Sequence, residues 1–459
     1  MGSGTAQSGR PLGGLERMLW LLRMNLTFAA GVEGPLDAAT LRGALDAVQR
    51  RHPLLRASVV EERGGPAFVV APATSPGPPI PLEVADAPAG SWTDWVESAE
   101  SELDRRFAAG EAPLARALLL RHGDGPGPER ATLLVTVSHA LADARAMGYL
   151  FRDLLEAAAR LRATGRADLD EKPLPPTIEE ILVRPLRLTE KLRGILRIGR
   201  TAGETRNPGP SRLPSAPAAV HGSPSTRILP LVVDPEGTAA LAARAREEGT
   251  TLHGALAAAH LLALAAECSR TGEAVRLYLA CPVNVAARVP SPVTDDVVLF
   301  ASGVDAAPRV TPGEPLWPLA RAVRRQLLPV GDPRERLLPS VLATGLAARM
   351  GPFLPADGRG RERLVAMAAK GPQVTLVTNI GVLDIPAALG PFRPRSFSFV
   401  VDNPVAPVMS SVATLGGTLT WCFATQRREV DDERAGRIAR AAERLLRGAL
   451  DRSAIRAEG

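Results

Sequence analysis

Apolar residues along the chain recur with two periods, which predict short strands separated by amphipathic helices. An uninterrupted aliphatic run at 131–137 is typical of a buried strand, and apolar residues on one side of 142–159 predict a helix. A second amphipathic helix is predicted from residue 37, and Pro53 stops it. The chain therefore alternates strands with helices around these two segments.

This alternation is interrupted once, in a segment rich in proline and arginine. Few apolar residues there fall into a strand pattern, and a strand followed by a helix resumes after residue 225. We therefore expect an N-terminal half at 12–170, a connecting segment at 171–225 and a C-terminal half at 226–459. The Gly/Ser-rich residues 1–11 are expected to be disordered.

Residues 184–200 of the connecting segment have the pattern of a basic amphipathic helix. Its apolar side carries Leu188, Leu192, Ile195 and Leu196, and its other side carries Arg187, Arg193, Arg197 and Arg200. Such a helix can lie on an anionic membrane surface. Because the stretch is short and Gly194 interrupts it, we favour the alternative that it packs its apolar side on its own domain.

Histidines and cysteines of the C-terminal half do not form a metal-binding pattern. His253 and His260 lie seven residues apart on a predicted helix, without a third ligand or a nearby carboxylate, so we expect both to pack in the core. The three cysteines, Cys268, Cys281 and Cys422, are far apart and suit neither a disulfide framework nor a zinc site. We expect them to be packing residues.

Composition is ordinary for a soluble globular protein of 459 residues, with 45% hydrophobic and 23% charged residues. No apolar run reaches the ~18 residues of a membrane span, and no signal peptide is recognisable, so we expect a cytoplasmic protein. The net charge of +6 comes mainly from arginine, but aromatic residues are only 4% and do not interleave with it. This argues against nucleic acid as a partner. The positive charge could instead attract the phosphates of coenzyme A or an acidic carrier protein.

Candidate chemistry centres on His139, which lies where the predicted strand ends and the helix begins. Such junctions commonly present reactive side chains to a cleft. Asp143 follows four residues later and, when ionised, only accepts hydrogen bonds. The pair suits a lone base with a structural carboxylate better than a metal site. The alternative is that His139 is a hydrogen-bonded structural residue and Asp143 a first-turn acid favoured by the helix dipole.

The stretch from Ser138 to Ala144 resembles the HHxxxDG signature of the chloramphenicol acetyltransferase-like superfamily, which includes condensation domains, wax ester synthases, polyketide-associated acyltransferases and alcohol acetyltransferases. Its H-x-x-x-D core is intact, whereas Ser138 replaces the first His and Ala144 replaces the Gly. The resemblance implies that His139 is catalytic and that Asp143 is an ion-pair partner that shapes the loop. It also implies an α/β (α+β) fold of two halves, each a mixed sheet with flanking helices, with an active-site tunnel between them.

Four further segments resemble the same superfamily. Residues 41–56 match its L-x-x-A-L-x-x-x-x-x-R-H-P-x-L-R block, in which His52 is structural, and residues 249–256 match a helix start. Residues 282–288 resemble its P-V-N-x-R region with the arginine displaced, which makes Arg288 the candidate ion-pair partner of Asp143. Asn379 lies in a segment similar to S/T-N-x-G, where it either lies near the tunnel or fixes the turn.

The chemistry implied is acyl transfer from a thioester to a hydroxyl or amine, with His139 as general base. Neither a G-x-S-x-G elbow nor a cysteine nucleophile is recognisable, which favours direct attack. We expect a freestanding, monomeric acyltransferase without a metal or permanently bound cofactor. Its co-substrate would be acyl-coenzyme A or an acyl or peptidyl carrier protein, and its small-molecule acceptor a lipid or secondary metabolite. The alternative, favoured by Ser138 and Ala144, is a catalytically silent scaffold that binds a carrier protein.

Overall fold

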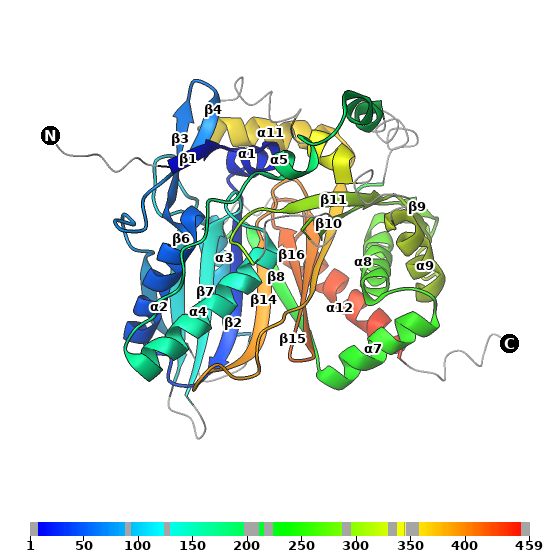
Figure 1. Cartoon of the computed structure of the whole chain (residues 1–459). Helices are drawn as coiled ribbons and strands as arrows, with labels where there is room; N and C mark the ends of the chain where they lie inside the picture. The colour runs from blue at the N-terminus through cyan, green and yellow to red at the C-terminus, as the bar shows by residue number, and fades with distance from the viewer. Residues whose placement is uncertain are drawn as a thin grey trace.

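Two mixed β-sheets stand side by side, and helices pack against both (Figure 1). The computed structural model describes residues 8–87, 93–123, 129–196, 211–214, 224–286, 295–328, 337–343, 345 and 358–450. Residues of the N-terminal half build most of the first sheet, and residues of the C-terminal half build the second. The expected α/β architecture of two halves, each a mixed sheet with flanking helices, is confirmed.

The first sheet has the strand order β14-β2-β7-β6-β5, and only β5 and β6 run parallel. Its strands are β2 (Asn25–Glu33), β5 (Leu82–Ala87), β6 (Ala115–His122), β7 (Arg130–Ser138) and β14 (Arg393–Val401). The predicted strand at 131–137 is β7, the central strand of this sheet. All but its first residue are buried, which explains why its sequence is aliphatic rather than alternating.

Helices α2 (Ala38–Arg51) and α4 (Ala144–Thr164) pack on each other, and α4 also contacts β2. Both were predicted, with boundaries that differ by a few residues. Phe28, Phe151 and Phe397 come from β2, α4 and β14, and their ring centroids lie 5.4 to 5.7 Å apart. This aromatic cluster joins the helix that follows His139 to the sheet below it.

The second sheet has the order β11-β10-β13-β15-β16-β8. Its strands are β8 (Thr226–Val233), β10 (Tyr278–Asn284), β11 (Ala301–Ala306), β13 (Val374–Val382), β15 (Val408–Leu415) and β16 (Thr418–Gln426). Strand β13 runs parallel to both of its neighbours, and the other pairs are antiparallel. A hairpin through Leu415-Gly416-Gly417 joins β15 to β16, and both glycines have positive φ.

The helices of the second half are α7 (Pro235–Glu247), α8 (Leu252–Cys268), α9 (Leu316–Leu327) and α12 (Asp432–Gly448). Helix α8 is the most buried of these and packs against both α9 and α12. In the described part of the chain, no single helix is long and apolar enough to cross a membrane. Only α7 and α8 taken together satisfy that test, and they meet at 94°.

The two halves are interleaved in space. Strand β14 follows β13 in sequence but pairs with β2 of the first sheet, so the first sheet contains a strand from the C-terminal half. Helix α3 (Val96–Asp104) packs against β2 and also against β8 of the second sheet. Its buried Glu100 lies 3.2 Å from arginines 227 and 427, which belong to the second half. The halves are therefore joined by backbone pairing and by ion pairs.

Part of the N-terminal segment that was expected to be disordered forms a strand. Residues 8–11, within the predicted disordered N-terminus 1–11, form β1 (Ser8–Pro11), which pairs with β4 (Gly65–Val70) and through it with β3 (Ala57–Glu62). Arg10 holds this strand in place, because it forms an ion pair with the buried Glu16 of α1 (Gly14–Leu21). Strands β4 and β5 follow in the Pro- and Gly-rich residues 64–89. Local composition did not reveal β1 because its partner strand β4 is more than 50 residues away in sequence.

The connecting segment 171–225 contains helical structure. Helix α5 (Ile178–Leu182) buries Ile178 and Leu182, and a second helix follows at 188–196. Arg197 and Arg200 of the predicted basic helix lie outside the described residues. The apolar side of helix 188–196 is exposed, so the expectation that it packs on its own domain is wrong.

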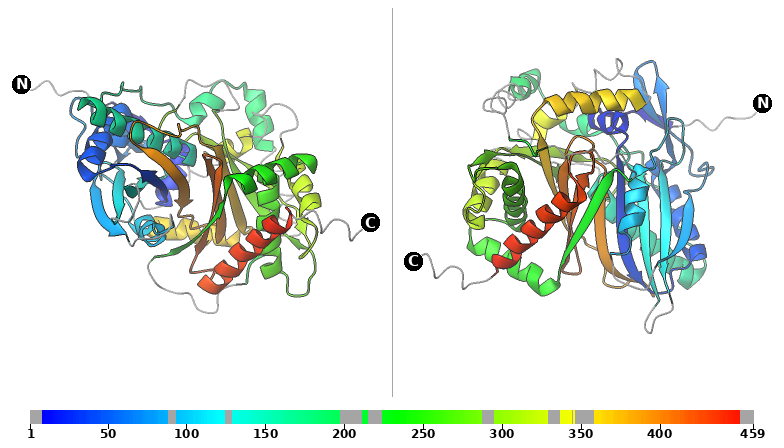
Figure 2. Two further views of the ribbon diagram at one scale, coloured as in Figure 1. Left: turned by 90° about the horizontal axis from the view of Figure 1, so that it is seen from below. Right: turned by 180° about the vertical axis from the view of Figure 1, so that it is seen from behind.

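The remaining elements are η1 (Pro53–Arg56), α11 (Gly358–Lys370) and the short pair β9 (Val275–Arg276) and β12 (Arg309–Val310). Figure 2 shows the same arrangement from below and from behind.

Candidate active site

His139 lies in the turn that connects β7 to α4. Its backbone N–H donates to the carbonyl of Met24, with 2.8 Å between N and O, and Leu141 N–H closes the turn on Ser138 O at 2.9 Å. The half-buried imidazole lines a cavity of about 1130 Å³ between the two halves of the chain. The predicted strand, motif and helix therefore direct this side chain into a cavity rather than into the core.

The hydrogen bond at Nδ1 determines the tautomer of His139. Nδ1 lies 2.8 Å from the carbonyl oxygen of Ala142, and because a carbonyl only accepts, Nδ1 carries the proton. Nε2 then has a free lone pair, and it makes no hydrogen bond within the described ranges. Burial lowers the pKa of His139 below its ordinary value, although the bond to Ala142 opposes this shift. The side chain is therefore neutral, with an available base at Nε2.

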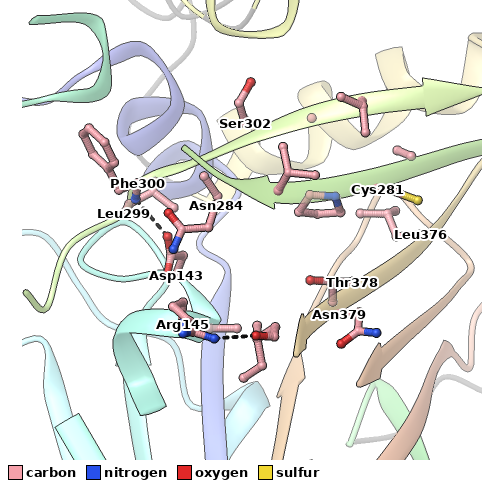
Figure 3. A pocket seen from close by; sticks show the side chains of 18 of the residues that line it. Asp143, Arg145, Cys281, Asn284, Leu299, Phe300, Ser302, Leu376, Thr378 and Asn379 are labelled. Atoms are coloured by element: carbon pink, nitrogen blue, oxygen red, sulfur yellow. Dashed lines mark hydrogen bonds between the residues drawn. The ribbon is translucent and has the colours of Figure 1, made fainter. Parts of the chain in front are cut away.

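Asp143 is the N-cap of α4 and also binds the second half. One carboxylate oxygen accepts from Ala146 N–H at 2.9 Å, and the other accepts from Phe300 N–H, just before β11, at 3.0 Å (Figure 3). Burial raises the pKa of Asp143, and these backbone hydrogen bonds oppose that rise. Arg288, the predicted ion-pair partner, lies outside the described residues. In the described part of the structure, backbone N–H groups rather than a salt bridge hold this carboxylate.

Arg145 forms a second link between the halves, which sequence reasoning missed. Its Nη1 donates to the carbonyl of Ile380 in β13 at 2.6 Å (Figure 3), and its Nε lies 3.2 Å from the Tyr149 hydroxyl. The side chain also lines the cavity. No spacing rule marks such an arginine, because its partner is a backbone carbonyl more than 200 residues away.

The two altered motif positions lie on either side of the His139 turn. Ser138 is the last residue of β7 and is buried, and its N–H donates to Leu114 O at 3.0 Å. Ala144 is the first residue of α4 and lines the cavity. Among the described residues other than glycine, only Arg23 and Asp295 have positive φ. The backbone at 144 therefore does not require glycine.

Asn379 combines the two roles that its sequence context suggested. It lines the cavity from β13, and its Oδ1 accepts from Gly381 N–H at 2.8 Å, which fixes the turn where Gly381 has φ of 75°. Because Oδ1 is occupied in this way, the side-chain amide NH₂ remains to donate toward a ligand. Asn284 of β10 is similar, since it lines the cavity and accepts from Ala286 N–H at 2.9 Å.

Apolar residues of β10, β11 and β13 make up much of the rest of the cavity wall. Figure 3 shows Cys281 and Leu376 there, together with Ser302 and Thr378. Sequence reasoning did not identify these residues, because scattered apolar positions are common to core and pocket. A volume of about 1130 Å³ is somewhat above the range of roughly 300–1,000 Å³ that is ordinary for ligand pockets.

His52 and His260 lie away from the cavity, whereas His253 lines it together with His139. His260 is buried in the second core, where Nε2 lies 2.6 Å from Thr375 Oγ1, as its core assignment predicted. His253 instead lines the cavity, and its Nδ1 is buried without a hydrogen-bond partner. His52 is structural as expected, because its Nε2 lies 2.9 Å from the buried carboxylate of Asp153. Among the described residues, no three His, Cys, Asp or Glu side chains are placed to hold a metal ion.

Comparisons with known proteins find matches in both halves of the chain. A family model described as the condensation domain matches residues 23–173, and one described as the phthiocerol/phthiodiolone dimycocerosyl transferase C-terminus matches residues 223–424. Chondramide synthase from Chondromyces crocatus is 29% identical over 178 residues, which cover 36% of this chain and 4% of that protein. The chain spans less than a third of the length of each curated relative that it matches.

Solved structures share the fold over nearly the whole chain. The TRI3 trichothecene 15-O-acetyltransferase from Fusarium sporotrichioides has a TM-score of 0.74 at 12% identity, covering 98% of this chain and 96% of that one. The polyketide synthase associated protein 5 from Mycobacterium tuberculosis has a TM-score of 0.65 at 17% identity, covering 96% and 98%. The two family models match separate halves of the chain, and the solved structures share the fold of both halves together. The chain therefore has the chloramphenicol acetyltransferase-like fold, with a condensation-domain match in its first half and an acyltransferase match in its second.

Proposed function

We propose that this chain transfers an acyl group from a thioester to a hydroxyl or amine, with His139 as the general base. The observation that carries the proposal is the hydrogen bond from Nδ1 to Ala142 O, because it leaves an unprotonated Nε2 facing a cavity of about 1130 Å³. The donor is acyl-coenzyme A or an acyl carrier protein, and the acceptor is a lipid or a secondary metabolite.

The reaction needs only groups that the cavity and the substrates supply. Nε2 takes the proton of the acceptor while its oxygen or nitrogen bonds to the thioester carbonyl carbon. When the tetrahedral intermediate collapses, the carbon–sulfur bond breaks and the proton passes from Nε2 to the leaving thiolate. The thiol and the new ester or amide are the products, and His139 returns to its neutral form.

Direct attack is favoured over an acyl-enzyme on the only cysteine among the residues that line the cavity. Cys281 is buried, and burial raises the pKa of its thiol above the ordinary value, so the nucleophilic thiolate is not populated at neutral pH. A neutral histidine, which can accept a proton at physiological pH, is the better candidate for the group that activates the acceptor.

The test is free-thiol release from a panel of acyl-coenzyme A donors and acyl carrier proteins, with mixed alcohol and amine acceptors. We expect release that requires an acceptor and that falls by about 100-fold or more in His139→Ala. Acceptor-dependent release at the wild-type rate by a folded His139→Ala protein would reject His139 as the base. Carrier-protein binding without turnover, in either protein, would instead support the silent scaffold.

A further inference from the structure

Helix 188–196 presents its apolar residues to solvent. Nine large apolar side chains are exposed in the described part of the chain, and four of them lie on this helix. These four are Leu188, Leu192, Ile195 and Leu196, which are 50 to 73% exposed. A cluster of this kind on one helix marks an interaction surface more often than scattered exposure does.

The opposite side of the helix attaches it to the protein. Gly194 is buried, and a Cβ atom there would lie 2.8 Å from Leu342 Cδ1 and 3.1 Å from Leu338 Cδ2. Glycine therefore allows the helix backbone to rest closely on segment 337–343. At about 100° per residue, Gly194 points away from the middle of the apolar stripe, so this attachment holds the stripe outward.

Basic residues border the apolar stripe. Helical geometry puts Lys191 on one side of it and Arg193 on the other. Residues 184–196 contain four basic residues and a single acidic one, Glu190. Glu190 is used locally, because its carboxylate accepts from Arg187 N–H at 2.7 Å at the start of the helix. The exposed surface therefore combines aliphatic side chains with a net positive charge.

We propose that helix 188–196 docks onto the surface of an anionic lipid bilayer, with its apolar stripe among the acyl chains and its basic flanks at the headgroups. An apolar stripe with cationic borders is the pattern of interfacial helices. The helix lies at the outer edge of the molecule, drawn in green and unlabelled at the upper right of Figure 1, and Figure 2 places it at the periphery as well. A convex, protruding helix suits a planar, deformable surface, whereas a protein partner must supply a matching groove.

Docking would bring the cavity wall close to the bilayer. Segment 337–343, on which Gly194 rests, contributes Leu337, Ser340 and Val341 to the cavity lining. A lipid acceptor or a long acyl chain would then reach the cavity from the membrane. This consequence depends on the proposed acyl transfer, but the docking itself does not.

The test is flotation of the full chain with phosphatidylcholine vesicles, with and without phosphatidylglycerol. We expect wild type to float with the anionic vesicles only, and to float less at high salt. Two double variants, Leu192→Glu with Ile195→Glu and Lys191→Glu with Arg193→Glu, should each float at least about tenfold less. Val232→Glu is the matched control, because Val232 is 50% exposed like Leu192 but lies on β8. It should float like wild type.

Flotation does not require acyl-transfer activity, so a failed activity assay leaves this test intact. Circular dichroism and the unfolding midpoint confirm that each variant is folded. Wild type that stays with the unbound fraction, or double variants that float like wild type, would overturn the proposal. A third outcome would also overturn it: wild type binds a purified acidic carrier protein but no vesicles, and the double variants lose this binding. The exposed surface would then be a binding site for a protein.

Discussion

The carboxylate of Asp143 accepts a hydrogen bond from the backbone N–H of Phe300, with 3.0 Å between Oδ2 and N. Asp143 begins α4 in the first half of the chain, and Phe300 directly precedes β11 in the second. The same carboxylate caps α4, so one side chain fixes the end of the His139 turn and also attaches it to the opposite wall of the cavity.

This double role predicts that Asp143→Ala is more harmful than the loss of an ordinary helix cap. The variant loses the cap, worth about 1 kcal/mol, and leaves the Phe300 N–H unpaired, which costs a further ~1–3 kcal/mol. Asp234→Ala is the matched control, because Asp234 caps the exposed start of α7 through Gly237 N–H at 2.7 Å and has no partner role at the cavity. Urea unfolding should show a loss of about 2–4 kcal/mol for the first and about 1 kcal/mol for the second. Equal losses, with equal acyl-transfer rates, would contradict the double role.

The pH dependence of kcat/KM should report the lowered pKa of His139. Protonation of Nε2 removes the base, so activity is lost as pH falls through this pKa, which burial places below the ordinary value of about 6.5. We expect the acid limb to be centred below pH 6.5, measured with a hydroxyl acceptor that does not itself titrate there. An acid limb centred above pH 6.5 would show that the imidazole is not in the neutral state described.

Ala144→Gly should leave acyl transfer within about threefold of wild type. The backbone at 144 is helical and does not need glycine, so the substitution removes one methyl group from the cavity wall and lowers stability by about 0.5–1 kcal/mol. Ala163→Gly, at an exposed position of the same helix, is the control for the stability change. A large gain in rate for Ala144→Gly alone would show that alanine impairs the site.

Cys281→Ala should retain transfer within about threefold and yield the same products. The thiol lines the cavity, but its pKa is raised by burial and direct attack does not use it. Intact-protein mass spectrometry after incubation with the donor should show no acyl adduct. Cys422→Ala, in which a buried thiol that is not among the cavity-lining residues is removed, controls for loss of packing. An acylated Cys281 peptide together with a 100-fold rate loss would establish covalent catalysis instead.

His260 should make the fold sensitive to acid. Burial lowers its pKa to about 3, whereas in the unfolded chain the pKa is near 6.5. Between these values the unfolded chain binds more protons, so stability falls with decreasing pH by about 1.4 kcal/mol per pH unit from this residue. The free energy of unfolding, measured with urea at several pH values from 7 to 4, should fall less steeply with pH in His260→Gln than in wild type, by that amount per pH unit. An unchanged slope would mean that His260 does not stay neutral in the fold.

Local sequence was sufficient for the elements around the proposed base. The aliphatic run of β7, the stop at Pro53 and the helix after Asp143 are each marked by residue types within the segment itself, and the structure has them close to where they were predicted. The turn that carries His139 follows from the same information. Its resemblance to a known motif identified the superfamily, and both family models agree.

Tertiary structure decided what no local pattern contains. Strand β1, the entry of β14 into the first sheet and the link from Arg145 to Ile380 depend on partners tens to hundreds of residues away. The outward direction of helix 188–196 was likewise not predictable, because an amphipathic pattern specifies that one side is apolar but not what that side faces. The sequence by itself determined which histidine is the candidate base and the class of fold. Only long-range packing decided the cavity around that histidine and the exposed apolar surface beside it.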